Sequence, residues 1–499
     1  MITFILSIVL LLLGYFIYSK WLGDRITINP RRLTPAVTME DGVDYVPMKP
    51  WRIFLIQFLN IAGVGPICGA IMGAQFGTAS FLWIVFGSIF AGAMHDFIAG
   101  FMSMRHHGCS LPELHGAFLG NGAKQVMRYF TVFLMILVGA VFVKTPAQLL
   151  IDQFTPGWQI WIWPVIIFAY YLVATLVPID KLIGKIYPIF GLLLLLMAVF
   201  IVVAFFVHPD VHLVEIWDGL ENRHPQAPKN PIFPMMFVSI ACGAISGFHA
   251  TQSPLMARCM TNERQARPIF YGAMIAEGIV ALVWAAAAAY FFHDKPELCV
   301  GKGGDAMVGV IAREWFTPVL ATVTLLGVIS AAVTSGDTAL RSARLIVADM
   351  FRIDQKPIVM RILVAIPIFV ISGGILVFSF RDAQGFQTIW RYFAWANQVL
   401  ATVTLWAITS FLFLRRGKGM FVVSLIPALF MTMVCASFIF VSQTEGLGAF
   451  IPRPWGYAIS AAITLFAPVF SGFWRQKRGI DSWRNMKQSQ KNKKRIIHL

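Results

Sequence analysis

Charged residues are scarce in this chain. Asp, Glu, Lys and Arg make up only 13% of its 499 residues, whereas about a quarter of the residues of a soluble domain are charged. Six cysteines are present without a CxxC pair, which argues against a disulfide framework. The chain also has no P-loop, GxSxG or protein-kinase motif set. A soluble enzyme is therefore excluded, and an ATP-driven pump would need a separate nucleotide-binding subunit.

Long apolar runs dominate the sequence instead. A membrane helix needs roughly 20 predominantly apolar residues, and thirteen such runs are present. We therefore predict an all-α polytopic membrane protein with about thirteen spans. Their approximate positions are 2–19, 53–75, 79–104, 127–150, 159–177, 186–207, 232–250, 268–292, 313–336, 358–380, 393–414, 420–442 and 455–474.

The net charge of +16 is distributed unevenly between the loops. When the thirteen spans are threaded with the N-terminus outside, all but nine of the 40 lysines and arginines fall on one side. Positive residues gather on the cytoplasmic side, so we predict a bacterial cytoplasmic-membrane protein with an external N-terminus and an internal C-terminus. The basic tail 476–499 is expected to contact anionic lipid rather than nucleic acid. The nine exceptions are Lys144, Arg223, Lys229, Lys295, Lys302, Arg313, Arg381, Arg391 and Arg453.

Glycine and proline interrupt the second and seventh spans. The second contains Gly63, Gly65 and Pro66, and the seventh contains Gly247 and runs into Pro254. Irregular backbone at membrane depth is tolerated where it is buried in protein or lines a cavity, and paired interruptions indicate a transporter site. An alternative is that these small residues only let helices pack closely.

The two interrupted spans are five spans apart. Because five is odd, the second unit would enter the membrane in the opposite direction, which predicts a five-plus-five inverted repeat of the leucine-transporter type. The expected parts are an N-terminal helix and loop (1–50), a core (51–414) with repeats 51–207 and 232–414, two C-terminal helices (415–475) and the tail 476–499.

Ionisable residues inside membrane spans usually mark function. His95 and Asp96 lie in the third span and Glu277 in the eighth. Burial disfavours the charged form of a carboxyl group, so Glu277 or the His95–Asp96 pair are candidate proton carriers, although Glu277 could also be a neutral structural acid. Lys144, near the outer end of the fourth span, either reaches the lipid headgroups or attracts an anionic group.

Hydroxyl groups line one face of the ninth span. Ser330, Thr334 and Asp337 follow at helical spacing, and Ser335 adjoins them. Oxygen ligands of this kind suit a hard cation such as Na⁺, which makes them the alternative coupling site. The hydroxyls could instead bond to their own helix carbonyls.

A loop after the third span carries several potential zinc ligands. Their spacing matches no standard zinc motif, so we predict a polar cytoplasmic loop, with no bound metal and no cofactor beyond the coupling ion. These residues are His106, His107, Cys109, Glu113 and His115.

Six segments together resemble the carbon starvation protein A family. They are FLNIAGVGPICGAIMGAQFG (58–77), GAMHDFIAGFMSMRHHG (92–108), SGFHATQSPLMARC (246–259), AEGIVALVWAA (276–286), TSGDTALRSARLIVAD (334–349) and YFAWANQ (392–398). The resemblance implies a transporter of peptides in starving bacteria, or of pyruvate as in close relatives. It also implies the fold of the amino acid–polyamine–organocation superfamily.

These observations lead to one functional hypothesis and two alternatives. We expect a secondary active transporter, not an enzyme, with a midplane substrate site at the two interruptions. The alternatives are a channel, or an intramembrane metalloenzyme using His95, Asp96 and His249. Expected substrate contacts are Gly63, Gly65, Pro66, Ser246, Gly247, Phe248, His249, Gln252 and Ser253.

Overall fold

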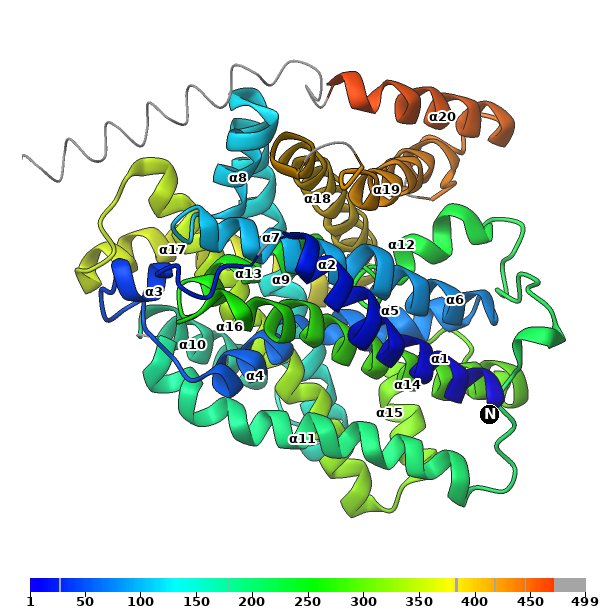
Figure 1. Cartoon of the computed structure of the whole chain (residues 1–499). Coiled ribbons are helices and arrows are strands. Elements are labelled where there is room, and N and C mark those ends of the chain that lie inside the picture. The colour runs from blue at the N-terminus through cyan, green and yellow to red at the C-terminus, as the bar shows by residue number, and fades with distance from the viewer. Residues whose placement is uncertain (27, 178, 382–384, 417–418, 445, 471–499) are drawn as a thin grey trace, which may run out of the picture.

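The computed structural model describes residues 1–26, 28–177, 179–381, 385–416, 419–444 and 446–470. Across these ranges all regular structure is helical and no strand is present, as the apolar runs predict (Figure 1). The predicted basic tail 476–499 lies outside the described residues.

The helices follow one another with short connections. In chain order they are α1 (Ile2–Leu13), α2 (Ser19–Ile26), α3 (Pro35–Thr38), α4 (Pro50–Ile61), α5 (Val64–Ala74), α6 (Ala79–Phe86), α7 (Ala93–Arg105), α8 (Leu111–Leu119), α9 (Asn121–Phe154), α10 (Ile162–Leu176), α11 (Ile179–Val207), α12 (Phe237–Ser239), α13 (Gly247–Ala257), α14 (Gly272–Asp294), α15 (Gly304–Trp315), α16 (Pro318–Phe351), α17 (Ile358–Arg381), α18 (Gly385–Arg416), α19 (Val422–Val441) and α20 (Arg453–Phe470). Wider π-helical turns occupy Gly14–Tyr18, Gly87–Gly92, Ile232–Met236 and Arg267–Tyr271, and short 3₁₀ turns occupy Ile216–Asp218, Glu263–Gln265 and Pro296–Leu298.

Many of these helices are long and apolar enough to cross a membrane. Among the described residues there are nine such segments, and a tenth if the bent pair α4–α5 is one span. The chain is therefore a multi-pass membrane protein. The count of thirteen spans and the inverted repeat stay predictions. The nine segments are Ile2–Ile26, Ala79–Arg105, Asn121–Phe154, Ile186–Val207, Glu263–Asp294, Pro318–Phe351, Ile358–Arg381, Thr388–Leu414 and Val422–Val441.

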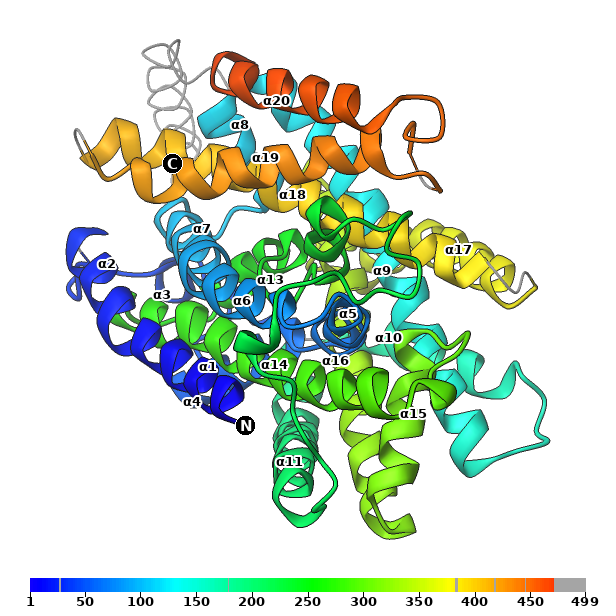
Figure 2. The ribbon, with the colours of Figure 1, turned by 90° about the vertical axis from the view of Figure 1, so that its right-hand side faces the viewer.

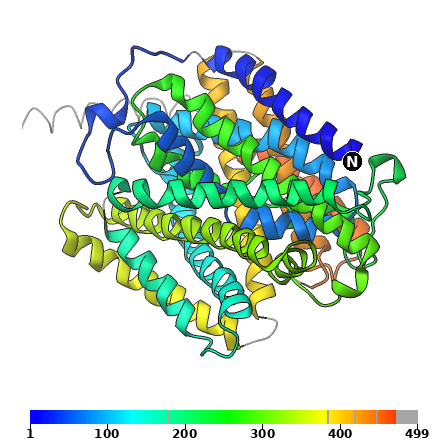
Figure 3. The same cartoon turned by 90° about the horizontal axis from the view of Figure 1, so that it is seen from below.

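Helix α14 lies inside the bundle, where every residue from Val280 to Phe291 is buried. The long helix α16 packs along both α9 and α11, and Figure 3 shows α11 and α16 side by side. In Figure 1, α11 follows the lower edge of the bundle while α19 and α20 lie at the top. The outer helices thus enclose a core built around α14 and the broken helices.

The predicted ninth span, 313–336, has the wrong boundaries. The helix starts at Pro318 and continues to Phe351, so Thr334 and Asp337 lie near its middle instead of at its end. In the sequence, the second half of this helix resembles a loop because it contains the charged residues Arg341 and Arg344. Both side chains are buried and make polar contacts in the bundle, and this tertiary pairing cannot be seen in the local sequence.

The second predicted span is broken. Helix α4 ends at Ile61, α5 begins at Val64, and the two axes differ by 46°. Pro66 is the third residue of α5, where its missing N–H removes no intrahelical bond. The break therefore lies at residues 62–63, at the start of the predicted Gly63–Pro66 interruption.

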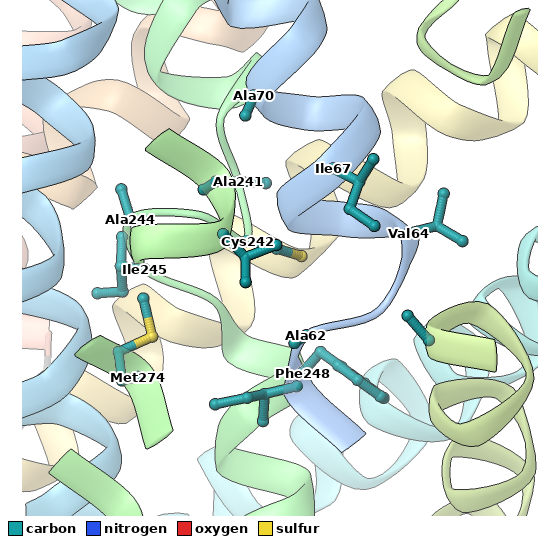
Figure 4. Close-up of a cluster of buried hydrophobic side chains, with 14 of the residues drawn as sticks. Ala62, Val64, Ile67, Ala70, Ala241, Cys242, Ala244, Ile245, Phe248 and Met274 are labelled. Carbon is teal, nitrogen blue, oxygen red and sulfur yellow. The ribbon is translucent and has the colours of Figure 1, made fainter. Parts of the chain in front are cut away.

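The seventh predicted span is also broken. Helix α12 ends at Ser239 and α13 begins at Gly247, with residues 240–246 non-helical between them. Figure 4 shows the turn that carries Cys242 facing the segment from Ala62 to Ile67. The two irregular segments are thus neighbours inside the bundle.

A stripe of glycines brings the two broken helices together. A Cβ atom on Gly65 would lie 2.3 Å from Cys242 Sγ, one on Gly69 would lie 2.8 Å from the Ser239 carbonyl oxygen, and one on Gly73 would meet Ile240. These glycines are one helical turn apart along α5, so they form a single face. These glycines therefore let α5 pack closely against the second break, and the interpretation of the two interruptions as a transporter site stays a prediction.

Replacing one glycine of this stripe should destabilise the protein. Gly65→Ala would place its methyl group 2.6 Å from Cys242 Cβ, and overpacking of this kind costs about 1–3 kcal/mol. We expect a lower melting temperature for the purified protein in detergent. Gly122→Ala is the control, because a Cβ there meets nothing within 4 Å. Equal melting temperatures for the two variants would contradict the packing.

Candidate functional site

Four buried ionisable side chains meet beside the second break. His95 and Asp96 come from α7, His249 from α13 and Glu277 from α14, and all four are fully buried. His249 Nδ1 lies 3.1 Å from Asp96 Oδ2, and His249 Nε2 lies 3.3 Å from Glu277 Oε2. His95 Nδ1 lies 2.8 Å from Asp96 Oδ1. We call these four residues the His249 cluster.

Close backbone packing holds α7 and α14 against the break. A Cβ on Gly92 would lie 2.2 Å from the Ala244 carbonyl oxygen, so only glycine fits at this crossing. The Ser88 hydroxyl donates to the Gly243 carbonyl at 3.0 Å. A Cβ on Gly278 of α14 would lie 2.8 Å from the Ser88 hydroxyl oxygen. Small residues therefore bring the three helices close enough for their polar side chains to meet.

The His249 cluster has the chemistry of a proton site. Buried charges are costly unless they are paired, and the His249 ring bridges two carboxyl groups from different helices. An imidazole can take up a proton on one nitrogen and release it from the other. Within the described residues, both Glu277 oxygens and His95 Nε2 are buried without a hydrogen-bond partner. The cluster therefore has capacity to accept a further proton.

A second polar group joins the first break to α16. Thr334 and Ser335 each donate a hydroxyl hydrogen bond of 3.1 Å to the Leu59 carbonyl, near the end of α4. Asp337 accepts from the Tyr170 hydroxyl at 3.0 Å and lies 3.1 Å from the Tyr187 hydroxyl. Hydroxyl and carboxylate oxygens of α16 thus lie beside a carbonyl oxygen of α4.

A cavity of about 910 Å³ opens at one end of the bundle. It reaches Cys68 in α5, little more than a helical turn from the first break, and it is bordered by the loops 223–230 and 296–303. Four basic residues, Lys144, Arg223, Lys302 and Arg391, line it together with Asp305. Burial lowers the pKa of His224, another lining residue, so lysine and arginine supply most of the cavity's charge at neutral pH.

Comparison with known proteins identifies the family. The family model described as carbon starvation protein CstA matches residues 1–157, 146–315 and 295–437. The chain belongs to the CstA family. A Haemophilus influenzae uncharacterised membrane protein is 44% identical over 347 residues, covering 60% of this chain and 93% of that protein.

Named transporters are more distant members of the CstA family. The peptide transporter CstA of Helicobacter pylori J99 is 27% identical over 376 residues, covering 61% of this chain and 54% of its own. The pyruvate/proton symporter BtsT of Escherichia coli is 28% identical over 374 residues, covering 59% of this chain and 50% of its own. The chain thus spans about half the length of these two relatives.

A solved structure shares the fold of this CstA-family chain. The Eremococcus coleocola manganese transporter superposes with a TM-score of 0.57 at 12% identity, covering 90% of this chain and 99% of that one. At this identity the likeness concerns the arrangement of helices alone.

The structure brings together residues that the sequence analysis assigned to separate candidate sites. His95–Asp96 and Glu277 were separate candidates for proton binding, and His249 was a candidate substrate contact; the four form one cluster. Ser330 donates to the Gly327 carbonyl of its own helix at 2.8 Å, as the alternative interpretation proposed. Lys144 lies at the cavity and not only at the lipid boundary.

The expected substrate contacts fall at several places around the two breaks. Gly63 precedes α5, and Gly65 and Pro66 lie in its first turn. In α13, Gln252 lies 3.4 Å from the Ser342 hydroxyl, and Ser253 bonds back to the His249 carbonyl. Their roles toward a substrate stay predictions.

The predicted polar loop after the third span is partly wrong. His115 is buried in α8, and its Nε2 lies 3.1 Å from the Thr404 hydroxyl, because α8 packs against α18. Glu113 forms ion pairs with Lys124 and Arg128, both at 2.5 Å. In the described ranges, no group of three or more His, Cys, Asp or Glu side chains is arranged to hold a metal ion.

Sequence reasoning missed Asn397. Its side-chain oxygen accepts from the Phe248 amide at 2.7 Å, and its side-chain nitrogen donates to the Ser246 hydroxyl at 2.9 Å. The N-terminus of α13, which is part of the predicted substrate site, is therefore capped by a residue from α18. Asn397 lies in the YFAWANQ segment, but nothing in its spacing indicates this partner.

Removing this cap should destabilise the second break. Loss of a helix cap typically costs about 1–2 kcal/mol, so Asn397→Ala should lower the melting temperature by several degrees. Asn121→Ala is the control, because Asn121 is exposed at the start of α9. If both variants melt like the parent, the Asn397 contacts do not stabilise the break.

Proposed function

We propose that this chain is a secondary active transporter that imports a carboxylate-bearing solute, a peptide or a small acid such as pyruvate, across the bacterial cytoplasmic membrane. The observation that carries this proposal is the meeting of two broken helices between a wide cavity and a cluster of buried ionisable groups. In the proposed orientation the cavity faces outward and the chain's C-terminus faces the cytoplasm.

The cavity opens at one end of the bundle, and this favours a transporter that works by alternating access over a channel. The cavity opens near α15, whereas the opposite end of the bundle is occupied by buried charged side chains, among them Asp44 and Arg344. A channel needs a continuous pore, and a transporter needs one side closed. His95, Asp96 and His249, the residues of the metalloenzyme alternative, meet in the His249 cluster, but no group of three or more His, Cys, Asp or Glu side chains in the described residues is arranged to hold a metal ion.

The lining of the cavity favours an anionic substrate. Four basic side chains accompany one aspartate, and a concave site with one sign of charge raises the local concentration of the opposite charge. Peptide and pyruvate, the substrates for which the relatives are named, both carry a carboxylate. A free α-amino group would be drawn to Asp305, the one acid among the lining residues described.

Proton coupling is the form of energy coupling that the site supports best. The His249 cluster links α13, whose start forms the second break, to α7 and α14. Adding a proton to His249 or Glu277 changes the attraction between these helices, which gives a physical route from proton binding to helix movement. The Escherichia coli relative BtsT is named a pyruvate/proton symporter, which agrees with this proposal.

Sodium coupling is a second candidate. Thr334 and Ser335 both point at the Leu59 carbonyl, so three oxygens converge next to the first break. Na⁺ prefers oxygen ligands of this kind. Thr334 also lies 3.0 Å from two carbonyls of its own helix, so its hydroxyl is satisfied without an ion.

Two substitutions separate these candidates. Glu277→Gln keeps the size and a polar group but cannot carry a proton, so it should abolish pH-driven accumulation while leaving counterflow, which needs no net coupling. Thr334→Val, of similar volume, should leave pH-driven accumulation near the parent level. The measurement is uptake of labelled pyruvate and dialanine into proteoliposomes.

The opposite pattern would support sodium. In that case Thr334→Val would lose sodium-driven uptake and Glu277→Gln would remain coupled. If both variants accumulate substrate like the parent, neither site carries the coupling ion and the proposed coupling is wrong.

A further inference from the structure

The loop 39–49 follows α3 and packs onto the bundle on the side of the molecule away from the cavity. Its tip is held in a tight turn by Asp41, whose Oδ1 accepts from the amides of Val43, Asp44 and Tyr45 at 2.8, 3.0 and 2.9 Å. Figure 2 shows α3, just before this loop, on one side of the molecule and α15, beside the cavity, on the other. The turn presents Asp44 and Tyr45 to the bundle.

Asp44 inserts between two arginines of α16. Its Oδ1 lies 3.7 Å from both Arg341 Nη1 and Arg344 Nη2. The side chain of Asp44 is 7% exposed, and those of Arg341 and Arg344 are 1% and 0% exposed. Two buried cations thus face one buried carboxylate that belongs to a loop.

This arginine pair has more donor capacity than Asp44 uses. A hydrogen bond between nitrogen and oxygen spans 2.7–3.2 Å, so both contacts are ionic attractions without a hydrogen bond. Among the described atoms, Arg341 Nη1, Arg344 Nε and Arg344 Nη2 are buried without a hydrogen-bond partner. Arginine forks match carboxylates in a bidentate way. The site is therefore built for an anion that approaches more closely than Asp44 does.

Other contacts of the loop reach α13 and the turn after α7. The Arg258 guanidinium lies 5.0 Å from the Tyr45 ring centre, and its Nε donates to the Gly108 carbonyl at 2.8 Å. The Tyr45 hydroxyl donates to the His107 carbonyl at 3.1 Å, and the Met48 amide donates to the Cys259 carbonyl at 3.1 Å. The loop thus joins α16, which carries Thr334, to the ends of α7 and α13, the helices that carry His95, Asp96 and His249 of the His249 cluster.

We propose that the loop 39–49 is the gate at the closed end of the transport path, and that Asp44 keeps it shut by occupying an arginine site that accepts a carboxylate ligand. This inference rests on the proposed transport function. When the loop leaves, Arg341 and Arg344 face the departing solute, and a carboxylate group on that solute takes the place of Asp44.

Native cysteines provide reporters for the gate. Cys259 is buried under the loop, and Cys68 lines the cavity at the other end. In a chain that keeps only Cys259, Asp44→Asn should raise the rate of maleimide labelling by about tenfold or more, because removing the charge shifts the population toward the open gate. Glu40→Gln is the matched control, since Glu40 is an exposed acid in the same loop.

The Cys68 reporter distinguishes a gate from general loosening. In a chain that keeps only Cys68, Asp44→Asn should slow labelling from the cavity side as the population shifts. Faster labelling of both cysteines would mean a loosened fold and would overturn the proposal, as would unchanged labelling of both. Tyr45→Leu, which removes the ring beside Arg258 but no charge, should act in the same direction by a smaller factor and serves if Asp44→Asn does not fold.

A separate experiment tests whether Arg341 and Arg344 bind a carboxylate ligand. Sodium pyruvate, compared with sodium chloride at equal ionic strength, should raise the melting temperature of Asp44→Asn more than that of the parent, because the arginines are vacated. The gain should disappear in Asp44→Asn/Arg344→Gln. Equal gains in all three proteins would rule out the arginine pair as a carboxylate site. A gate that responds in labelling while proteoliposomes show no uptake would leave the gate standing and overturn the proposed function.

Discussion

Irregular backbone inside a membrane protein must find hydrogen-bond partners and close packing, and this constraint shapes the centre of the molecule. Residues 240–246 leave the helix in the bundle interior, where water cannot satisfy their polar groups. Ser88 bonds to the Gly243 carbonyl, Asn397 caps the start of α13, and Gly65 lets α5 approach Cys242. The partners of the second break therefore come from helices distributed along the whole chain.

Helices α13 and α16 connect the middle of the molecule to the end where the loop 39–49 packs. Helix α13 carries His249 near its start, and Arg258 directly follows its last turn. Helix α16 carries Thr334 near its middle and Arg344 closer to its C-terminal end. A change in charge at the His249 cluster acts on helices that also hold the loop 39–49. In the proposed mechanism, coupling between ion binding and gate opening therefore needs no separate signalling element.

Some of this architecture can be read from the sequence because it depends on local composition. The apolar runs predict the helices, and glycine and proline locate both breaks to within a few residues. Partners in space cannot be read in the same way. Asp96, His249 and Glu277 are distant in sequence and lie on three helices. They meet only because Gly92 and Gly278 let these helices pack closely together. Asn397 and Asp44 were missed for the same reason, and buried Arg341 and Arg344 made half of α16 resemble a loop.

Proton-driven transport is tested most directly by uptake of labelled pyruvate and dialanine into proteoliposomes under three conditions: an imposed pH gradient, an imposed sodium gradient, and neither. We expect accumulation of at least one of these carboxylates above its external concentration when the outside is acidic, and only equilibration when no gradient is imposed. Equilibration under all three conditions would show a channel or an uncoupled carrier and would contradict a secondary active transporter driven through the His249 cluster.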